Sequence, residues 1–171
     1  MKKKKKRIRH TTVIGVTGCI PHVGVTHLTI MLANYLSSKE RYVVAAMDMS
    51  ENNTFGLLKE ILEEQILQNC MSAQMNENFQ VYKVNYYCKA DWKGISDILQ
   101  MGYEYVIVDL GIDVQKSRQW IRCDKIIMVG SCCEWQYKQF QDEILKCQSD
   151  GISWEYASFL GIDEVRRSLE K

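Results

Sequence analysis

The segment spanning residues 12–36 limits the fold of this chain most, because a strand, a short loop and a helix follow one another there without a break. Residues 12–17 read TVIGVT and predict a strand, and Gly18, Pro21 and Gly24 mark the loop. Apolar residues then recur at helical spacing and predict one apolar stripe: Leu28, Met31, Leu32, Tyr35 and Leu36. The N–H groups and the dipole at such a helix start favour an anion.

The loop has the frame of a phosphate-binding loop from which the lysine is missing. In the pattern G-x-x-x-x-G-K-[ST], backbone N–H groups surround the phosphates and the lysine neutralises them. Here Gly24-Val25-Thr26 stands where Gly-Lys-Thr is expected, and the first glycine of the pattern falls on Cys19, one place after Gly18. Gly18 and Gly24 are expected to supply unusual backbone dihedrals, and Thr26 a hydroxyl for Mg²⁺.

Three residues of the loop argue against tight phosphate binding. Pro21 removes a backbone donor, His22 places a bulky side chain in the loop, and Val25 carries no charge. A charge-assisted hydrogen bond contributes about 1.5–3 kcal/mol, so triphosphate binding is expected to be about tenfold to a hundredfold weaker. His22 and His27 are partial substitutes when protonated; the alternative is that both are exposed histidines of the loop and the helix start.

Further strand and helix signals alternate along the rest of the chain. Three of the expected strands, at 42–48, 104–110 and 125–130, are continuous apolar runs, which is typical of a parallel sheet buried on both faces. The other expected strands lie at 79–84 and 155–160, and helical patterns lie at 54–68, 91–101, 115–121 and 137–147. We therefore expect an α/β fold, three-layered and doubly wound, in one domain over residues 11–171, with its ligand crevice at the carboxyl ends of the strands.

Composition is typical of a soluble cytoplasmic protein, with 46% hydrophobic and 25% charged residues. No apolar run approaches the ~18 residues of a membrane span, and no signal peptide is recognised. Seven cysteines without CxxC spacing predict reduced, mostly buried thiols. The adjacent Cys132 and Cys133 are either a redox or soft-metal pair or part of the packing at a strand end.

Residues 2–9, KKKKKRIR, carry seven positive charges, so the remainder of the chain is mildly acidic. This basic tail, residues 1–10, either binds an anionic membrane surface or nucleic acid, or is a solvated tail. If it binds lipid, the protein is peripheral at the inner face of the membrane. Residues 161–171 are mixed in charge and do not predict a membrane anchor.

Aromatic residues and lysines interleave over residues 79–92, FQVYKVNYYCKADW. One interpretation is a platform on which nucleic-acid bases stack. The other is a strand and loop with Phe79, Val81 and Val84 directed inward. Trp135, after the fifth expected strand, is a candidate for stacking on a base or for a protein contact.

Taken in order, these segments resemble the ParA/MinD family of deviant P-loop ATPases, whose relatives include the pilus-assembly protein TadZ and the tyrosine-kinase partner ATPases of capsule synthesis. The resemblance covers roughly residues 10–150. It rests on four matches: VGVT at 23–26 for the end of the K-G-G-V-G-K-T loop, YVVAAMDMS at 42–50 for the strand ending in D-x-D, YEYVIVD at 103–109 for "YDYIIVD", and CDKIIMVG at 123–130 for "ADEVILV".

The resemblance implies roles for individual residues. Asp109 matches the Walker B carboxylate that acts on Mg²⁺ through water, and Asp48 matches the first acid of the D-x-D segment; Ser50 replaces the second. The family's signature lysine falls on Ile20 and its Walker lysine on Val25. The alternatives are that Asp109 caps the next helix or turn, and that Asp48 forms a turn at a strand end.

Three functions are therefore predicted, the first being favoured. In the first, the chain is a degenerate, non-hydrolysing family member that binds or positions a partner protein. In the second, it is an ATPase or nucleotide switch that binds ATP or ADP with Mg²⁺ weakly, with a cation supplied by a partner chain or by the tail. In the third, it is an electrostatic membrane or nucleic-acid adaptor that acts through residues 2–9. The family's ATP-dependent homodimer is a further implied arrangement. The expected cofactor site is Gly18, His22, Gly24, Val25, Thr26 and His27, with Thr26 and Asp109 on the metal and Asp48 and Asp109 as catalytic candidates.

Overall fold

The computed structural model describes residues 10–67, 78–112, 122–130, 134–149 and 155–158. Its centre is a seven-stranded sheet with the order β3-β4-β2-β5-β1-β6-β7. Every neighbouring pair is parallel except β3 and β4 at one edge, which are antiparallel. The strands are β1 (Thr12–Gly18), β2 (Val44–Asp48), β3 (Asn78–Val81), β4 (Val84–Tyr87), β5 (Tyr105–Asp109), β6 (Lys125–Gly130) and β7 (Glu155–Ser158). The described helices are α1 (Val25–Ser38), α2 (Thr54–Leu67), α3 (Ile95–Gln100) and α5 (Glu134–Ser149).

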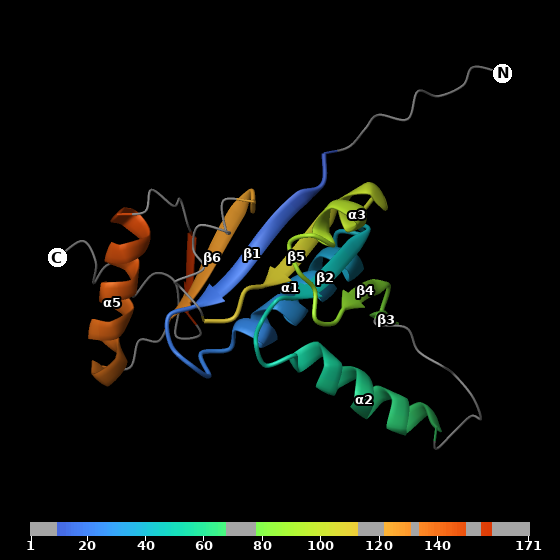
Figure 1. Ribbon diagram of the computed structural model, residues 1–171, viewed down its shortest axis with the longest axis horizontal. Helices are drawn as coiled ribbons and strands as arrows, with labels where there is room; N and C mark the ends of the chain where they lie inside the picture. Colours follow the sequence, from blue (N-terminus) through green and yellow to red (C-terminus); the bar gives the residue numbers. More distant parts are fainter. Residues whose placement is uncertain (1–9, 68–77, 113–121, 131–133, 150–154, 159–171) are drawn as a thin grey trace.

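Helices cover both faces of this sheet, which gives the expected three layers (Figure 1). Alternate residues of β5 show the division, since Val106 and Val108 join the core beneath α3 and α5, whereas Ile107 joins the core beneath α1 and α2. A strand that buries side chains on both faces must be apolar throughout. The continuous apolar runs in the sequence are therefore explained, and the predicted doubly wound, mostly parallel α/β fold is confirmed.

The central strands bring distant parts of the chain to one edge. In the parallel register Val16 is opposite Asp109 and Asp48 is also opposite Asp109, so β1, β5 and β2 end side by side. Within the described residues the predicted strands at 12–17, 42–48, 104–110, 125–130 and 155–160 are confirmed, with end shifts of one or two residues.

The predicted strand at 79–84 is wrong, because the chain folds back inside it. β3 and β4 pair as a hairpin around Tyr82 and Lys83, which have φ values of 46° and 72°. Two successive residues with positive φ form the tight turn that matches the twist of a hairpin. Such turns usually contain Asn-Gly or Asp-Gly. Because Tyr82 and Lys83 stand here instead, no signal for this turn is present in the sequence.

The aromatic residues of this hairpin are mostly core residues rather than a platform for bases. Phe79 is 5% exposed and Tyr86 1% exposed, and their rings stack with centroids 5.1 Å apart. Val84 is buried and Val81 half-buried, so the inward orientation predicted for this segment is confirmed. The platform interpretation is wrong for Phe79 and Tyr86, because neither ring is accessible to a base.

α1 and α2 form where predicted, but the buried face of α1 is rotated from the predicted apolar stripe. On α1 the buried residues are Val25, Thr29, Ala33 and Ser37, whereas Met31 and Tyr35 are more than half exposed. Small residues let the helix approach the sheet closely, and the leucines flank the contact. On α2 the apolar Leu57 and Ile61 are likewise 55% and 53% exposed.

Other sequence expectations meet the structure in part. Cys19 is buried, and Cys88 and Cys123 are half-buried. Among the described residues no helix is long and apolar enough to cross a membrane. The predictions for the basic tail at 2–9, the helix at 115–121, Cys132 and Cys133, the Trp135 side chain and the segment 161–171 lie outside what the structure describes.

A close contact in the core provides a test of the packing. A Cβ added at Gly130 would clash with the Phe140 ring, and Phe140 is 2% exposed. We expect Gly130→Ala to lower the free energy of unfolding by about 1–3 kcal/mol, because the ring and α5 must move. Urea denaturation measures this.

Gly94→Ala is the matched control, since the nearest atom to its Cβ is 3.5 Å away and its φ is −69°. Equal losses in the two variants would contradict the packing described for β6 and α5.

Candidate functional site

The loop between β1 and α1 lies at the edge where β1, β5 and β2 end. Its base is fixed to the turn that follows β5. Gly111 O accepts hydrogen bonds from Gly18 N at 2.9 Å and from Thr17 Oγ1 at 3.0 Å, and Val16 O accepts one from Leu110 N at 2.8 Å. These bonds hold the loop against the carboxyl end of β5.

The start of α1 presents backbone donors to this edge. Gly24 is the N-cap with φ of 95°, and the first helical bond runs from Leu28 N to Gly24 O. The amides of residues 25–27 therefore precede the helical ladder and point out of the helix end. The unusual backbone dihedral predicted for Gly24 is confirmed as a left-handed one, and His22 adopts a φ of 61° that a glycine would adopt without strain.

Gly18 serves a different purpose from the predicted one. It is not among the residues with positive φ. A Cβ at this position would lie 2.7 Å from a methyl group of Val23, 2.7 Å from one of Val25 and 3.3 Å from one of Ile112. Position 18 therefore has no room for a side chain, because apolar side chains pack directly on it.

The two positions that match the family's lysines are both part of the core. Ile20 is 3% exposed and packs in the core beneath α3 and α5, while Val25 is 7% exposed and packs in the core beneath α1 and α2. A lysine would carry its ammonium group out of such sites into the loop. The aliphatic side chains instead use these positions to fix the loop to the sheet.

Asp109 is completely buried beside the first turn of α1. Its Oδ2 accepts a 2.6 Å hydrogen bond from Thr26 Oγ1, and its Oδ1 accepts one from Gly111 N at 2.9 Å. Burial raises the pKa of Asp109 above its ordinary value of 3.8, the two hydrogen bonds partly offset this rise, and the neighbouring Asp48 carboxylate adds to it. The predicted metal ligands Thr26 and Asp109 therefore contact each other.

Asp48 is also completely buried, and its hydrogen bonds are local. Oδ1 accepts bonds from Ser50 N at 2.9 Å and Ser50 Oγ at 2.6 Å, and Oδ2 accepts one from Phe55 N at 2.9 Å. This is the turn-forming arrangement that the sequence offered as the alternative for Asp48. Its carboxylate joins the end of β2 to the start of α2.

A cavity of about 560 Å³ lies over the loop. It is lined by residues 21–27, 49–52, Thr54 and 109–112. The described residues of this lining include no lysine or arginine, and the ionisable ones are His22, His27, Glu51 and Asp109. The hydroxyl and carboxylate of Thr26 and Asp109 form an oxygen pair of the kind that Mg²⁺ prefers. A triphosphate would find helix-start amides here, but no fixed cation from the described lining.

The structure brings most of the predicted cofactor residues together, since His22, Gly24, Val25, Thr26 and His27 all line this cavity. Gly18 and Asp48 lie behind it. Sequence reasoning missed two contributors, Gly111 with φ of 66° and the apolar Ile112. A glycine directly after a strand-end acid was the available signal for the first. No group of three or more His, Cys, Asp or Glu residues that could hold a metal ion occurs in the described part of the chain.

Comparisons with known proteins support the fold. No protein-family model and no curated protein matches the sequence. Among solved structures, a plasmid partition protein from Borrelia burgdorferi B31 bound to AMPPNP is 13% identical, with 86% of this chain and 74% of that chain covered and a TM-score of 0.60. The kinase domain of the Escherichia coli tyrosine kinase ETK is 14% identical, with 90% and 68% covered and a TM-score of 0.61.

MinD of the MinC:MinD cell division complex of Aquifex aeolicus is similar in the same way. This match is 17% identical, covers 86% of this chain and 68% of that chain, and has a TM-score of 0.65. The chain therefore has the fold of the ParA/MinD P-loop ATPases, as the order of its sequence motifs predicted.

The burial of Asp109 gives a prediction with a pH dependence. Its folded pKa is raised, so the ionised carboxyl costs stability above that pKa, and the cost disappears as pH falls towards the unfolded value of 3.8. We expect Asp109→Asn to be more stable than the unmodified chain at pH 7 by about 1 kcal/mol, or about 2–4 °C in Tm. Thr26 then accepts a hydrogen bond from the amide.

Thermal unfolding between pH 4 and pH 8 measures this difference. Asp142→Asn, at an exposed position of α5, is the control and should have little effect. A lower Tm for Asp109→Asn across the whole range would contradict the account of this buried carboxyl.

Proposed function

We propose that this protein is a degenerate member of the ParA/MinD-like P-loop family that does not hydrolyse ATP and acts by binding or positioning a partner protein. The observation that carries the proposal is the burial of Ile20 and Val25, at 3% and 7% exposure. Both positions that match lysines in the family hold aliphatic side chains packed into the core. The loop keeps its shape through these contacts, and residues 18–27 include no lysine or arginine to place on a phosphate.

The absence of lysines at positions 20 and 25 is expected to lower the rate of ATP hydrolysis more than the affinity for ATP. A donor aimed at developing charge typically contributes about 10²–10³ in rate. Asp48, the other catalytic candidate, directs its carboxylate oxygens to Ser50 and Phe55. This arrangement supports a role in shaping the turn before α2, rather than in activating water.

Exposed apolar side chains favour a protein partner. Met31 and Tyr35 lie four residues apart on α1, and Leu57 and Ile61 lie four residues apart on α2. All four are more than half exposed on helices that cover the same face of the sheet. Each pair is therefore available for contact with a partner protein. A related fold binds a protein in the MinC:MinD complex, which makes partner binding a reasonable use of this one.

A nucleotide switch is the second candidate, and one observation favours it. The Thr26 hydroxyl and the Asp109 carboxylate are 2.6 Å apart beside helix-start amides, where Mg²⁺ and a phosphate would be held. In that case a partner chain or the tail at residues 2–9 supplies the cation. Weak binding of ATP or ADP with Mg²⁺ is compatible with the first proposal, whereas turnover belongs to the second.

Calorimetric titration with ATP and ADP, with and without Mg²⁺, tests the proposal. We expect the unmodified chain to bind ATP no more tightly than about 0.1 mM, or about −5.5 kcal/mol, and to release no phosphate above the buffer rate. Val25→Lys restores the missing cation and should tighten binding about tenfold to a hundredfold.

Val25→Met is the matched control, because it adds length without charge and should leave nucleotide affinity unchanged. Circular dichroism checks that each variant folds. Micromolar binding of ATP by the unmodified chain, or magnesium-dependent turnover that Asp109→Ala abolishes, would overturn the proposal in favour of the nucleotide switch.

A further inference from the structure

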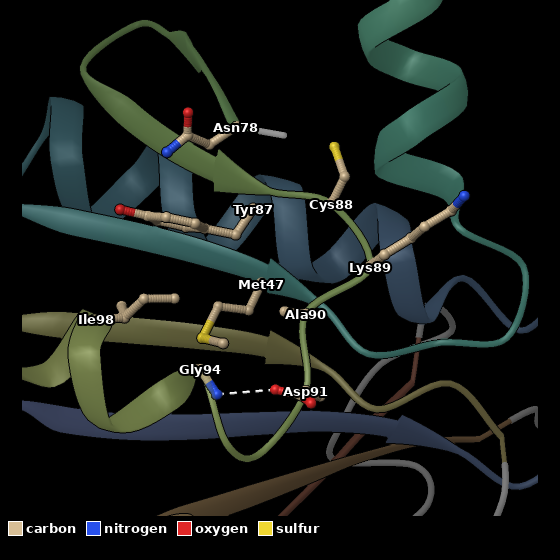
Figure 2. Close-up of a pocket in the computed structure, with 9 residues that line it drawn as sticks. All are labelled: Met47, Asn78, Tyr87, Cys88, Lys89, Ala90, Asp91, Gly94 and Ile98. Atoms are coloured by element: carbon tan, nitrogen blue, oxygen red, sulfur yellow. Dashed lines mark hydrogen bonds between the residues drawn. The ribbon is translucent and has the colours of Figure 1, made fainter. Parts of the chain in front are cut away.

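We infer that a second cavity, separate from the loop site, binds a small organic acid with an apolar body, such as an acyl or aryl carboxylate or sulfonate. The cavity has a volume of about 500 Å³, within the range of about 300–1,000 Å³ common for small-molecule sites. It is lined by Met47, Asn78, Tyr87, Cys88, Lys89, Ala90, Asp91, Gly94 and Ile98 (Figure 2). None of these residues lines the cavity over the loop.

The floor of this cavity is apolar. Met47 of β2 and Tyr87 of β4 lie on the sheet surface, and Ile98 approaches from α3 (Figure 2). Met47 is completely buried, Ile98 is 6% exposed, and Tyr87 and Ala90 are partly buried against the same core. An acyl chain or an aromatic ring placed here would cover the parts of Tyr87 and Ala90 that remain exposed.

The Tyr87 ring is held flat by contacts at its far end. Its hydroxyl is 2.9 Å from the Tyr103 hydroxyl and 3.3 Å from the Met101 sulfur. Because these contacts engage the polar tip, the ring presents its apolar body to the cavity.

One wall is a loop that is held by hydrogen bonds to β2 and within itself. Ala90 N donates a 2.8 Å hydrogen bond to Asp48 O, which joins the loop to the end of β2. Asp91 Oδ1 accepts bonds from Lys93 N at 3.1 Å and Gly94 N at 2.8 Å, the second of which is drawn in Figure 2. A wall fixed in this way lowers the entropic cost of binding, since the site is already formed.

Charge at the rim selects the sign of the ligand. Among the described residues that line the cavity, Lys89 is the one cation, and the one carboxylate, Asp91, already accepts two backbone hydrogen bonds. Lys89 has a φ of 50°, a conformation that a residue with a side chain rarely adopts and that the Ala90 and Asp91 bonds hold in place. Its exposed side chain extends away from Met47 in Figure 2, and its rotatable bonds let the ammonium group meet an acid at the rim.

The test uses the full chain and two probes that match this chemistry. Fluorescence titration with 8-anilinonaphthalene-1-sulfonate, followed by displacement with octanoate, measures both affinities. We expect Lys89→Gln to weaken both about tenfold, through loss of one charge-assisted contact. Ala90→Leu, which fills the cavity, should abolish displaceable binding. Lys93→Gln is the matched control, because this exposed lysine lies on the same loop but does not line the cavity.

Amide resonances in ¹H–¹⁵N spectra supply a readout that holds even if Ala90→Leu fails to fold. Octanoate should shift the signals of residues 87–98 and leave those of 21–27 unchanged. No saturable binding of either probe, shifts that centre on residues 21–27, or equal affinity in Lys89→Gln and Lys93→Gln would each overturn the inference. Nucleotide affinity is measured separately, so the outcome does not depend on the proposal for the loop site.

Discussion

The fold at the functional edge depends on apolar packing within the β1–α1 loop. The Val25 side chain, in the first turn of α1, packs over Gly18. Ile20 is buried on the other face of the sheet, in the core beneath α3 and α5. The two contacts tie the loop to both faces of the sheet. In a phosphate-binding loop the ligand's charge and a lysine organise the chain. Here the aliphatic side chains of Ile20 and Val25 are buried and pack the loop against the sheet.

Two buried carboxyl groups, those of Asp48 and Asp109, lie at the strand ends beside this loop. Asp48 and Asp109 are opposite each other in the parallel register and both are fully buried. Buried carboxylates are costly unless hydrogen bonds or cations compensate them. Thr26 and Gly111 supply donors to Asp109, while Ser50 and Phe55 supply donors to Asp48. Hydrogen bonds from the chain itself thus compensate both carboxylates, and they join the ends of β5 and β2 to the starts of α1 and α2.

The sequence predicted the fold well, because strands buried on both faces must be continuously apolar and the motifs follow one another in order. It also placed Thr26 and Asp109 at one site. It failed where tertiary contacts decide the outcome. The Tyr82-Lys83 turn has no glycine or asparagine to reveal it, and the buried face of α1 follows the small residues rather than the large ones. The role of Gly18 was missed for the same reason, since the adjacent residues in the sequence do not reveal which side chains pack on a glycine in the fold.

We propose that aliphatic side chains have taken the place of the cations while the fold has been kept. The decisive experiment is a crystal structure of the protein grown with a non-hydrolysable ATP analogue and Mg²⁺. We expect Ile20 and Val25 to stay packed in the core and no ordered γ-phosphate or metal to occupy the cavity over the loop. A triphosphate held by the amides of residues 24–27, with Mg²⁺ between Thr26 and Asp109, would contradict it.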